Sequence, residues 1–209
     1  MKAQLRRSTL AIALLFVVAS AGVSKAQEGM PEMPKPTKEH ELLKKEVGDW
    51  KAEMRAWMGP GEPVVSAGRE HNEMVGGFWC LSKFEGSFAG QPFLGTATLG
   101  YNAAEKVYTG SWVDSVTPER MSMTGTYDEK SKTMTWKTES VGPDGEPVVG
   151  KMTVVYKDED TRSMTMFNPA GPGGEMMKVM EIDYSRATKV SKADTGTGIS
   201  ISPAGSDGK

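Results

Sequence analysis

Methionine is the residue type whose placement most suggests a binding site, because it recurs at alternate positions of short apolar stretches. Alternate residues of a β-strand share one face of the sheet. Nine of the 15 methionines fall on faces that would point into one interior, together with Trp136: Met54, Met58, Met121, Met123, Met134, Met152, Met164, Met166 and Met180. Thioether side chains are flexible and polarizable, so such a wall adapts to a lipid, isoprenoid or aromatic guest. All of these except Met58, together with Trp136, are the predicted ligand-binding residues; the alternative is that they fill a solid, irregular core.

Few residues are placed for catalysis or for metal binding. The chain has two histidines, His40 and His71, and a single cysteine, Cys80, and it contains no HExxH, CxxC, Walker or GxSxG motif. We therefore predict no metal site, no cofactor and no catalytic residue. Cys80 lies mid-strand in an apolar context and is expected to be a buried structural thiol. A haem-binding barrel of the nitrobindin type would need a late histidine facing the lumen, and none follows His71.

Arg69 and His71 are weak polar candidates, since they share one face of a predicted strand. If that face points inward, the two side chains could hold the carboxylate of a ligand. His71 with Glu70 or Glu73 would then suggest a hydrolase or isomerase, but a solvated strand face is the more common arrangement. Because charged residues occur on both faces, the sequence does not determine which face of this strand points inward. A further minor alternative is copper(I) handling by the methionine thioethers.

Gly48, Trp50 and Arg186 form a predicted structural plug. Trp50 opens an alternating strand, so Trp50, Ala52 and Met54 share one face while charged residues occupy the other. Arg186 ends the last strand on its apolar face, where stacking on the Trp50 indole as a cation–π pair would satisfy it. The alternative is that Arg186 lies past the strand end and is solvated.

The elements that must position these residues are almost all strands. Period-two alternation between turn signals predicts ten strands: 50–58, 65–74, 78–85, 93–101, 107–114, 120–127, 133–141, 148–157, 162–167 and 176–186. A short helix over 38–46 precedes them and is expected to cover one end. Short turns between successive strands, and a hairpin motif repeated after Tyr101 and Tyr127, predict an all-β fold: a single antiparallel up-and-down barrel.

The two ends of the chain differ from the rest in composition. A basic start, the apolar run 10–18 and small residues before Gln27 predict a signal peptide over 1–26, and hence export to the periplasm or the medium. Residues 27–37 form a proline-rich spacer, 38–187 the barrel domain, and the Gly/Ser/Thr-rich 188–209 a disordered tail. Residues 1–26 hold four basic and no acidic residues, so 21 basic residues then stand against 27 acidic ones, a net charge of −6. That balance disfavours nucleic acid as a partner, and no later apolar run is long enough for a membrane span.

Several motifs together carry a family resemblance. Gly48-x-Trp50 on a first strand, with an arginine ending the last, resembles the signature of the lipocalin-like (calycin) barrels, which bind small hydrophobic molecules. The ordered set His40-x-x-Leu43, Gly48-x-Trp50, Gly100-Tyr101-Asn102, Gly125-x-Tyr127-Asp128 and Tyr184-x-Arg186 is similar to the bacterial family called domain of unknown function 1579. The resemblance implies a barrel and no established activity.

These observations predict an exported barrel that binds a small apolar or amphipathic molecule. They favour a binding module over an enzyme. The main alternative is a solidly packed barrel that serves as an envelope interaction or structural protein.

Overall fold

The computed structural model describes residues 32–142, 144–171 and 174–187. One compact unit begins at Pro36 and holds every helix and strand of the described part. The predicted signal peptide, the tail 188–209 and residues 27–31 of the spacer lie outside the described residues. The elements are α1 (His40–Lys44), β1 (Gly48–Ala56), β2 (Val64–Val75), β3 (Trp79–Phe88), β4 (Gln91–Asn102), β5 (Val107–Asp114), β6 (Met121–Asp128), β7 (Thr133–Val141), β8 (Pro147–Tyr156), β9 (Thr161–Pro169) and β10 (Met176–Arg186).

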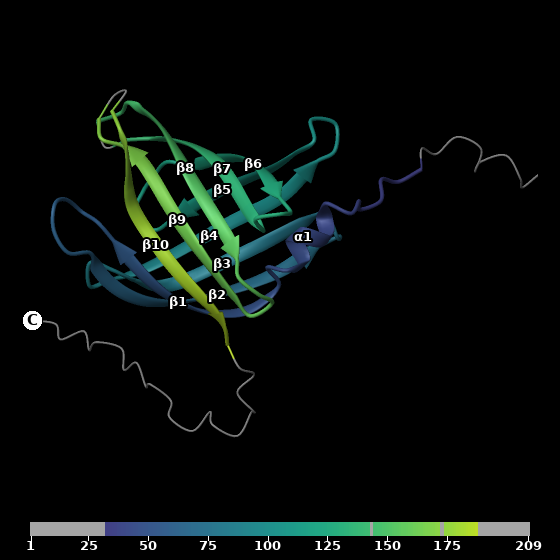
Figure 1. The fold of residues 1–209 in the computed structure, drawn as a ribbon, viewed down its shortest axis with the longest axis horizontal. Coiled ribbons are helices and arrows are strands. Elements are labelled where there is room, and N and C mark those ends of the chain that lie inside the picture. Colours follow the sequence, from purple (N-terminus) through teal and green to yellow (C-terminus); the bar gives the residue numbers. More distant parts are fainter. Residues whose placement is uncertain (1–31, 143, 172–173, 188–209) are drawn as a thin grey trace, which may run out of the picture. The chain divides into compact units, whose positions relative to one another are not determined.

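The ten strands close into one antiparallel barrel in which each strand pairs with its neighbours in sequence (Figure 1). Closure is made by β1 and β10, which pair from Trp50 opposite Arg186 to Ala56 opposite Met180. Full closure satisfies the backbone groups that an edge strand would expose. The predicted ten-stranded up-and-down barrel is confirmed.

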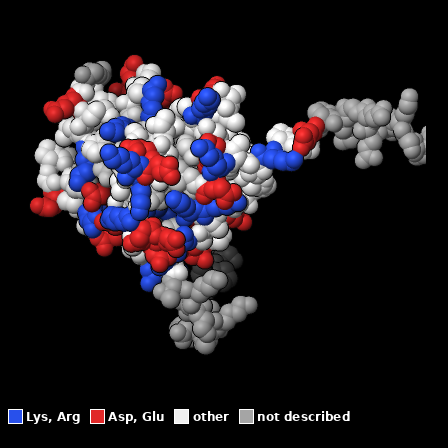
Figure 2. Space-filling view, turned by 45° about the vertical axis from the view of Figure 1, so that its right-hand side comes forward, with Lys and Arg blue, Asp and Glu red and all other residues white. Residues whose placement is uncertain are grey.

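The inward face of β1 follows the predicted alternation. Trp50, Ala52 and Met54 are buried, whereas Lys51 and Glu53 are exposed. Figure 2 shows basic and acidic side chains intermixed over the displayed face of the molecule. The period-two pattern therefore separates a charged exterior from an apolar interior.

The structure shows which face of strand β2 points inward, which the sequence did not determine. Glu70 and Asn72 are buried, while Arg69 and His71 are exposed on the outer surface. The His71 Nδ1 lies 2.7 Å from the Asp49 Oδ1, on the outside of the barrel. The suggestion that Arg69 and His71 hold a ligand carboxylate is therefore wrong, and a catalytic pairing of His71 with an inward Glu70 is excluded because the two point to opposite faces.

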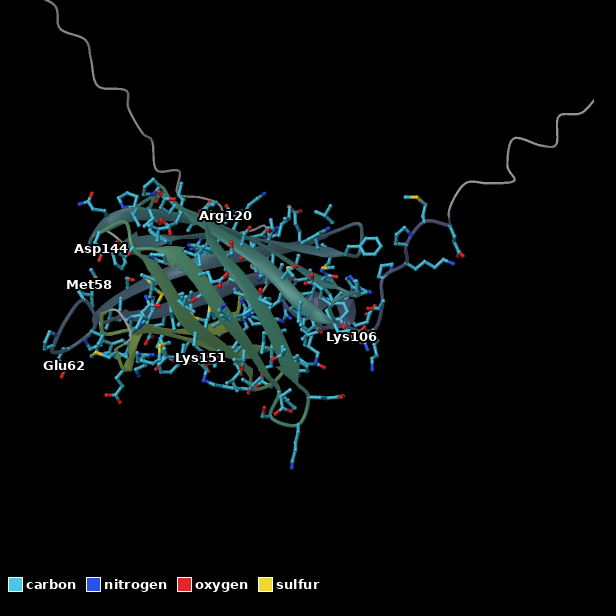
Figure 3. All side chains as sticks on the ribbon, turned by 90° about the horizontal axis from the view of Figure 1, so that it is seen from above. Met58, Glu62, Lys106, Arg120, Asp144 and Lys151 are labelled. Atoms are coloured by element: carbon cyan, nitrogen blue, oxygen red, sulfur yellow. The ribbon has the colours of Figure 1, made fainter. Side chains whose placement is uncertain are left out.

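Met58 also lies elsewhere than expected. Strand β1 ends at Ala56, so Met58 falls in the following loop, where 68% of its surface is exposed. Figure 3 shows this loop at the end of the barrel opposite Lys106. The alternation of β1 does not continue past the strand, and Met58 is not part of the interior.

Helix α1 covers the end of the barrel where β1 begins (Figure 1). It is shorter than predicted, yet Leu42 and Leu43 are buried and belong to a core cluster with Cys80 and Trp136. The Tyr108 hydroxyl donates a hydrogen bond of 3.0 Å to the carbonyl oxygen of Glu39. A helix this short is held by such tertiary contacts rather than by its own hydrogen bonds.

Candidate functional site

The barrel lumen contains a cavity of about 340 Å³. All nine residues predicted to bind a ligand line it, and they come from six strands: Met54, Met121, Met123, Met134, Trp136, Met152, Met164, Met166 and Met180. Their ability to bind a ligand stays a prediction. Their convergence shows that alternation in single strands is enough to find the lining of a closed barrel.

Aromatic rings complete the apolar wall. Phe84, Phe88, Phe93 and Trp112 line the cavity beside the methionines. The rings of Phe93 and Trp112 are stacked with centroids 6.3 Å apart, and Phe84 meets Phe93 edge-on at 5.9 Å. The wall thus combines fixed ring faces with adaptable thioethers.

Glycines in the sheet make room for the larger rings. A Cβ added at Gly125 on β6 would lie 2.5 Å from the Trp136 ring, which crosses the strand at that point in the paired register. Any side chain at Gly125 would therefore push Trp136 out of its place in the cavity wall.

The closed end of the cavity is polar and centres on Arg162. This residue is 4% exposed, and its guanidinium carbon lies 4.1 Å from the centroid of the Trp50 ring and 4.2 Å from that of Tyr184. The Arg162 Nη1 lies 2.8 Å from the Glu46 Oε2, and Nη2 donates a hydrogen bond to the Glu70 Oε1. A planar guanidinium suits this arrangement, because it can pair with carboxylates through its N–H groups and stack on aromatic rings.

Further hydrogen bonds fix the two carboxylates. The Asn72 amide donates to the Glu70 Oε1 at 2.7 Å and to the Glu46 carbonyl oxygen at 2.9 Å, and the Tyr156 hydroxyl donates to the Glu46 Oε1. The Trp50 indole N–H donates to the same Glu46 carbonyl at 2.7 Å. These groups form one buried network, which we call the polar base: Glu46, Glu70, Asn72, Tyr156, Arg162 and Tyr184.

Arg162 and the two phenols of the polar base each keep one protonation state. Burial by itself lowers the pKa of Arg162, but the carboxylates of Glu46 and Glu70 outweigh it and raise that pKa above its ordinary value. Burial, reinforced by the charge of Glu46 beside Tyr156 and of Glu70 beside Tyr184, raises the pKa of both phenols. Arg162 is therefore a permanent cation and the two tyrosines stay neutral.

The predicted plug residues lie together outside the polar base. The Arg186 guanidinium carbon is 4.2 Å from the centroid of the Trp50 ring, on which Arg162 also stacks. Arg186 Nη1 donates to the Val47 carbonyl at 2.7 Å and Nη2 to the Lys45 carbonyl at 3.1 Å. Gly48 has a φ of +120°, and a Cβ there would lie 2.8 Å from the Arg186 Nη1, so glycine suits this position on both counts. Arg186 is partly exposed at the strand end, yet its polar atoms are bonded to the backbone.

Glu46 and Arg162 were not predicted as site residues, and Glu70 was considered only as a partner of His71. A signal was present for Arg162, because it shares the parity of Met164 and Met166 on β9, which predicts an inward side chain. For Glu70, the charged neighbours on both sides hid the alternation. Glu46 precedes β1 and has no strand parity at all.

The opposite end of the cavity reaches the surface. It is lined there by Asp114, Val116, Thr117 and Glu119, which lie at and beyond the end of β5, and by Val141 at the end of β7. Val116 is 52% exposed and Val141 42%. We call this end the mouth.

Cys80 and His40, the other titratable residues considered for chemistry, are buried by packing and do not face the cavity as reactive groups. Cys80 is fully buried, and burial followed by the charges of Glu46 and Glu70 raises the pKa of its thiol to about 12. His40 is buried against Phe78 and Tyr101, and its Nδ1 accepts a hydrogen bond of 2.9 Å from the Thr37 amide. Within the described ranges, no three His, Cys, Asp or Glu side chains gather in a metal-binding arrangement.

A closed ten-stranded antiparallel barrel, with a short helix at one end and a lined lumen, defines a lipocalin-like fold. The chain belongs to the family described as Protein of unknown function (DUF1579), which matches residues 35–186. The predicted family resemblance is thus confirmed.

Solved structures share the fold at low sequence identity. Rv2717c from M. tuberculosis has a TM-score of 0.57 at 12% identity, over 74% of this chain and 100% of that one. The S-type phycobiliprotein lyase CPES from Guillardia theta has a TM-score of 0.50 at 13% identity, over 74% and 95% of the two chains. No curated protein matches the sequence. In the described part of the chain, no helix has the length and apolar character needed to cross a membrane.

Proposed function

We propose that this protein is a binding module that takes one small apolar or amphipathic molecule into the barrel lumen. The observation that carries the proposal is the cavity of about 340 Å³ walled by methionine and aromatic side chains. A solidly packed barrel, the main alternative, would have these side chains in mutual contact across the lumen.

The size of the cavity limits the guest. Its volume is about twice that of an engineered apolar cavity of about 150 Å³ that holds benzene. It falls near the lower end of the range of about 300–1,000 Å³ found for small-molecule sites. The proposed guest therefore has one or two fused rings, or a short branched chain, rather than a long acyl tail.

Titration with N-phenyl-1-naphthylamine, an uncharged probe whose fluorescence rises in apolar surroundings, tests the proposal. We expect saturable binding to the wild-type protein. Ala97 is buried and lines the cavity, so Ala97→Leu places three further carbons in the lumen. We expect this substitution to weaken binding by at least about tenfold, or about 1.4 kcal/mol.

Thr96→Leu is the matched control, because Thr96 precedes Ala97 on β4 and is exposed on the outer face. It should bind the probe as the wild type does, and circular dichroism should show that both variants are folded. Absence of saturable binding to the wild type, or equal loss in both variants, would contradict the proposal.

We further propose that the protein works outside the cytoplasm. The support is the basic and apolar composition of residues 1–26, which is typical of a cleavable signal peptide. The intact mass of the protein isolated from its own cells should correspond to a chain that begins at Gln27. A mass that includes residues 1–26 would contradict export by this route.

A further inference from the structure

The charges that line the cavity are unbalanced. Four carboxylates line it, Glu46 and Glu70 in the polar base and Asp114 and Glu119 at the mouth, against one cation, Arg162. Burial by itself raises the pKa of Asp114, but the hydrogen bonds from Thr117, Val116 and Trp112 together outweigh it and lower that pKa, so this group is ionised at neutral pH. An entering molecule therefore meets an excess of negative charge from the mouth to the base.

The charge of the cation is already balanced by two carboxylates, although its Nη1 makes no hydrogen bond of good geometry. Arg162 faces a carboxylate with each of its terminal nitrogens, and the rings of Trp50 and Tyr184 lie against its guanidinium. A ligand carboxylate or phosphate would have to displace Glu46 or Glu70 to reach it. Leaving a buried carboxylate without its partner costs several kcal/mol in general, so the polar base does not suit an anionic guest.

The polar base leaves one acceptor, the amide oxygen of Asn72, without a donor. Asn72 is 2% exposed, and both bonds of its amide nitrogen go to oxygen atoms, which fixes the orientation of the amide. Its Oδ1 is buried without a hydrogen-bond partner. Unpaired buried acceptors are uncommon, because each forfeits its bonds to water. A group that brings an N–H into this end of the cavity would satisfy it.

Neighbouring residues of the cavity wall carry further acceptors. Asn72 is paired in register with Ser82 of the adjacent strand, and both residues line the cavity together with Glu70. An ammonium group has three N–H donors. The amide oxygen of Asn72, the carboxylate of Glu70 and the hydroxyl of Ser82 offer three acceptors of the right kind at one place.

We propose that the guest is an organic amine, whose ammonium head lies at the polar base against Glu70 and Asn72 and whose apolar body lies between the methionines and rings. The inference rests on the proposed binding function and specifies its ligand class. It assigns Glu70 and Asn72 as the residues that select the head group, and Arg162 as the residue that holds Glu70 in place.

Three probes that share one ring system and differ in the head group test the assignment. Isothermal titration at neutral pH would compare 2-naphthylmethylamine, 2-naphthylmethanol and 2-naphthoate on the wild-type protein. We expect the amine to bind at least about tenfold, or about 1.4 kcal/mol, more tightly than the alcohol, and the carboxylate to bind least.

The variant Glu70→Gln keeps the size of the side chain and removes its charge. It should reduce the preference for the amine over the alcohol to less than about threefold, or about 0.65 kcal/mol. Glu73→Gln is the matched control, because Glu73 lies on the same strand, exposed on the outer face, and should leave the preference unchanged. The wild-type comparison does not depend on either variant folding.

The possible results distinguish a failure of the amine assignment from a failure of the proposed binding function. Equal affinity for the three probes, or tighter binding of 2-naphthoate, would overturn the amine assignment and leave the binding function standing. A preference for the amine that persists in Glu70→Gln would overturn the role of Glu70. If none of the three naphthyl probes binds, and N-phenyl-1-naphthylamine also fails to bind, the proposed function itself fails.

Discussion

At the scale of single residues, the barrel places one guanidinium between two carboxylates and two aromatic rings. Arg162, Glu46 and Glu70 are each less than one-tenth exposed, so the ionic contacts are shielded from water. A buried ion pair adds little net stability over an apolar replacement, because desolvation offsets the attraction. Removing one partner has a different effect, since it leaves buried charge without compensation.

Arg162→Met is expected to lower the free energy of unfolding by about 3–5 kcal/mol, because Glu46 and Glu70 would then face each other without a cation. Denaturant unfolding followed by tryptophan fluorescence measures the loss. Lys137→Met serves as the control: Lys137 pairs with Glu139 on the surface and its side chain is 59% exposed, so its loss should cost no more than about 1 kcal/mol. Equal effects of the two substitutions would show that the polar base is not electrostatically coupled.

The Cys80 thiol is expected to be unreactive in the folded protein. Burial raises its pKa to about 12, so the thiolate that reacts with disulfide reagents is scarce at mildly alkaline pH, and the side chain is also out of reach. A thiol assay with 5,5′-dithiobis(2-nitrobenzoate) should give no signal until denaturant is added, and then one thiol per chain. Rapid labelling of the native protein would contradict the buried position.

Sequence reasoning at this scale found apolar lining residues and missed the charged ones. Methionine and tryptophan at alternate positions have one plausible location, the interior. A glutamate or arginine at the same parity is usually read as a surface residue, because burying a charge is costly unless it is paired. Glu46, Glu70 and Arg162 come from three distant segments, and their pairing exists only after the barrel closes.

At the scale of elements, the alternation of hydrophobicity specified the strands closely. The bounds of β5, β7 and β10 are those predicted, because clear turn signals flank each strand. Helix α1 is shorter than its pattern suggested, since Lys45 and Glu46 already turn toward β1. The inward face of β2 could not be predicted, because charged residues occupy consecutive positions there.

Arg186 connects the end of β10 to the segment between α1 and β1. Its guanidinium donates to the carbonyls of Lys45 and Val47, and its Nε donates to the Glu159 carbonyl at 3.0 Å. Lysine has no planar fork and cannot make these bonds together.

We therefore expect Arg186→Lys to reduce stability by about 1–2 kcal/mol and to speed hydrogen–deuterium exchange in residues 40–48 more than in the central strands β5 and β6. Lys157→Ala removes another cation at this end of the barrel, from a surface cleft that Trp50 and Arg186 also line, and it should leave exchange in 40–48 unchanged. Uniform acceleration throughout the barrel would mean that Arg186 supports global stability and does not anchor the helix.

At the scale of the whole barrel, the two ends differ. Helix α1, Trp50, Arg162 and Arg186 close one end, while the cavity reaches the surface between the loops at the other. A guest would enter at the mouth with its polar head first and leave its apolar body against the methionines. The fold class, and the methionines and Trp136 that face the lumen, were predictable from alternation and turn signals. The existence of a cavity was not, because methionine side chains can equally fill a lumen.

Whether the lumen holds a guest can be decided by native mass spectrometry of the protein purified from its own cells without organic solvent. We expect a population whose mass exceeds that of the polypeptide by one small organic molecule, which organic extraction releases. Ala97→Leu purified in the same way should lack it, and Thr96→Leu should retain it. A wild-type protein that carries no guest and binds none of the naphthyl probes would contradict the account.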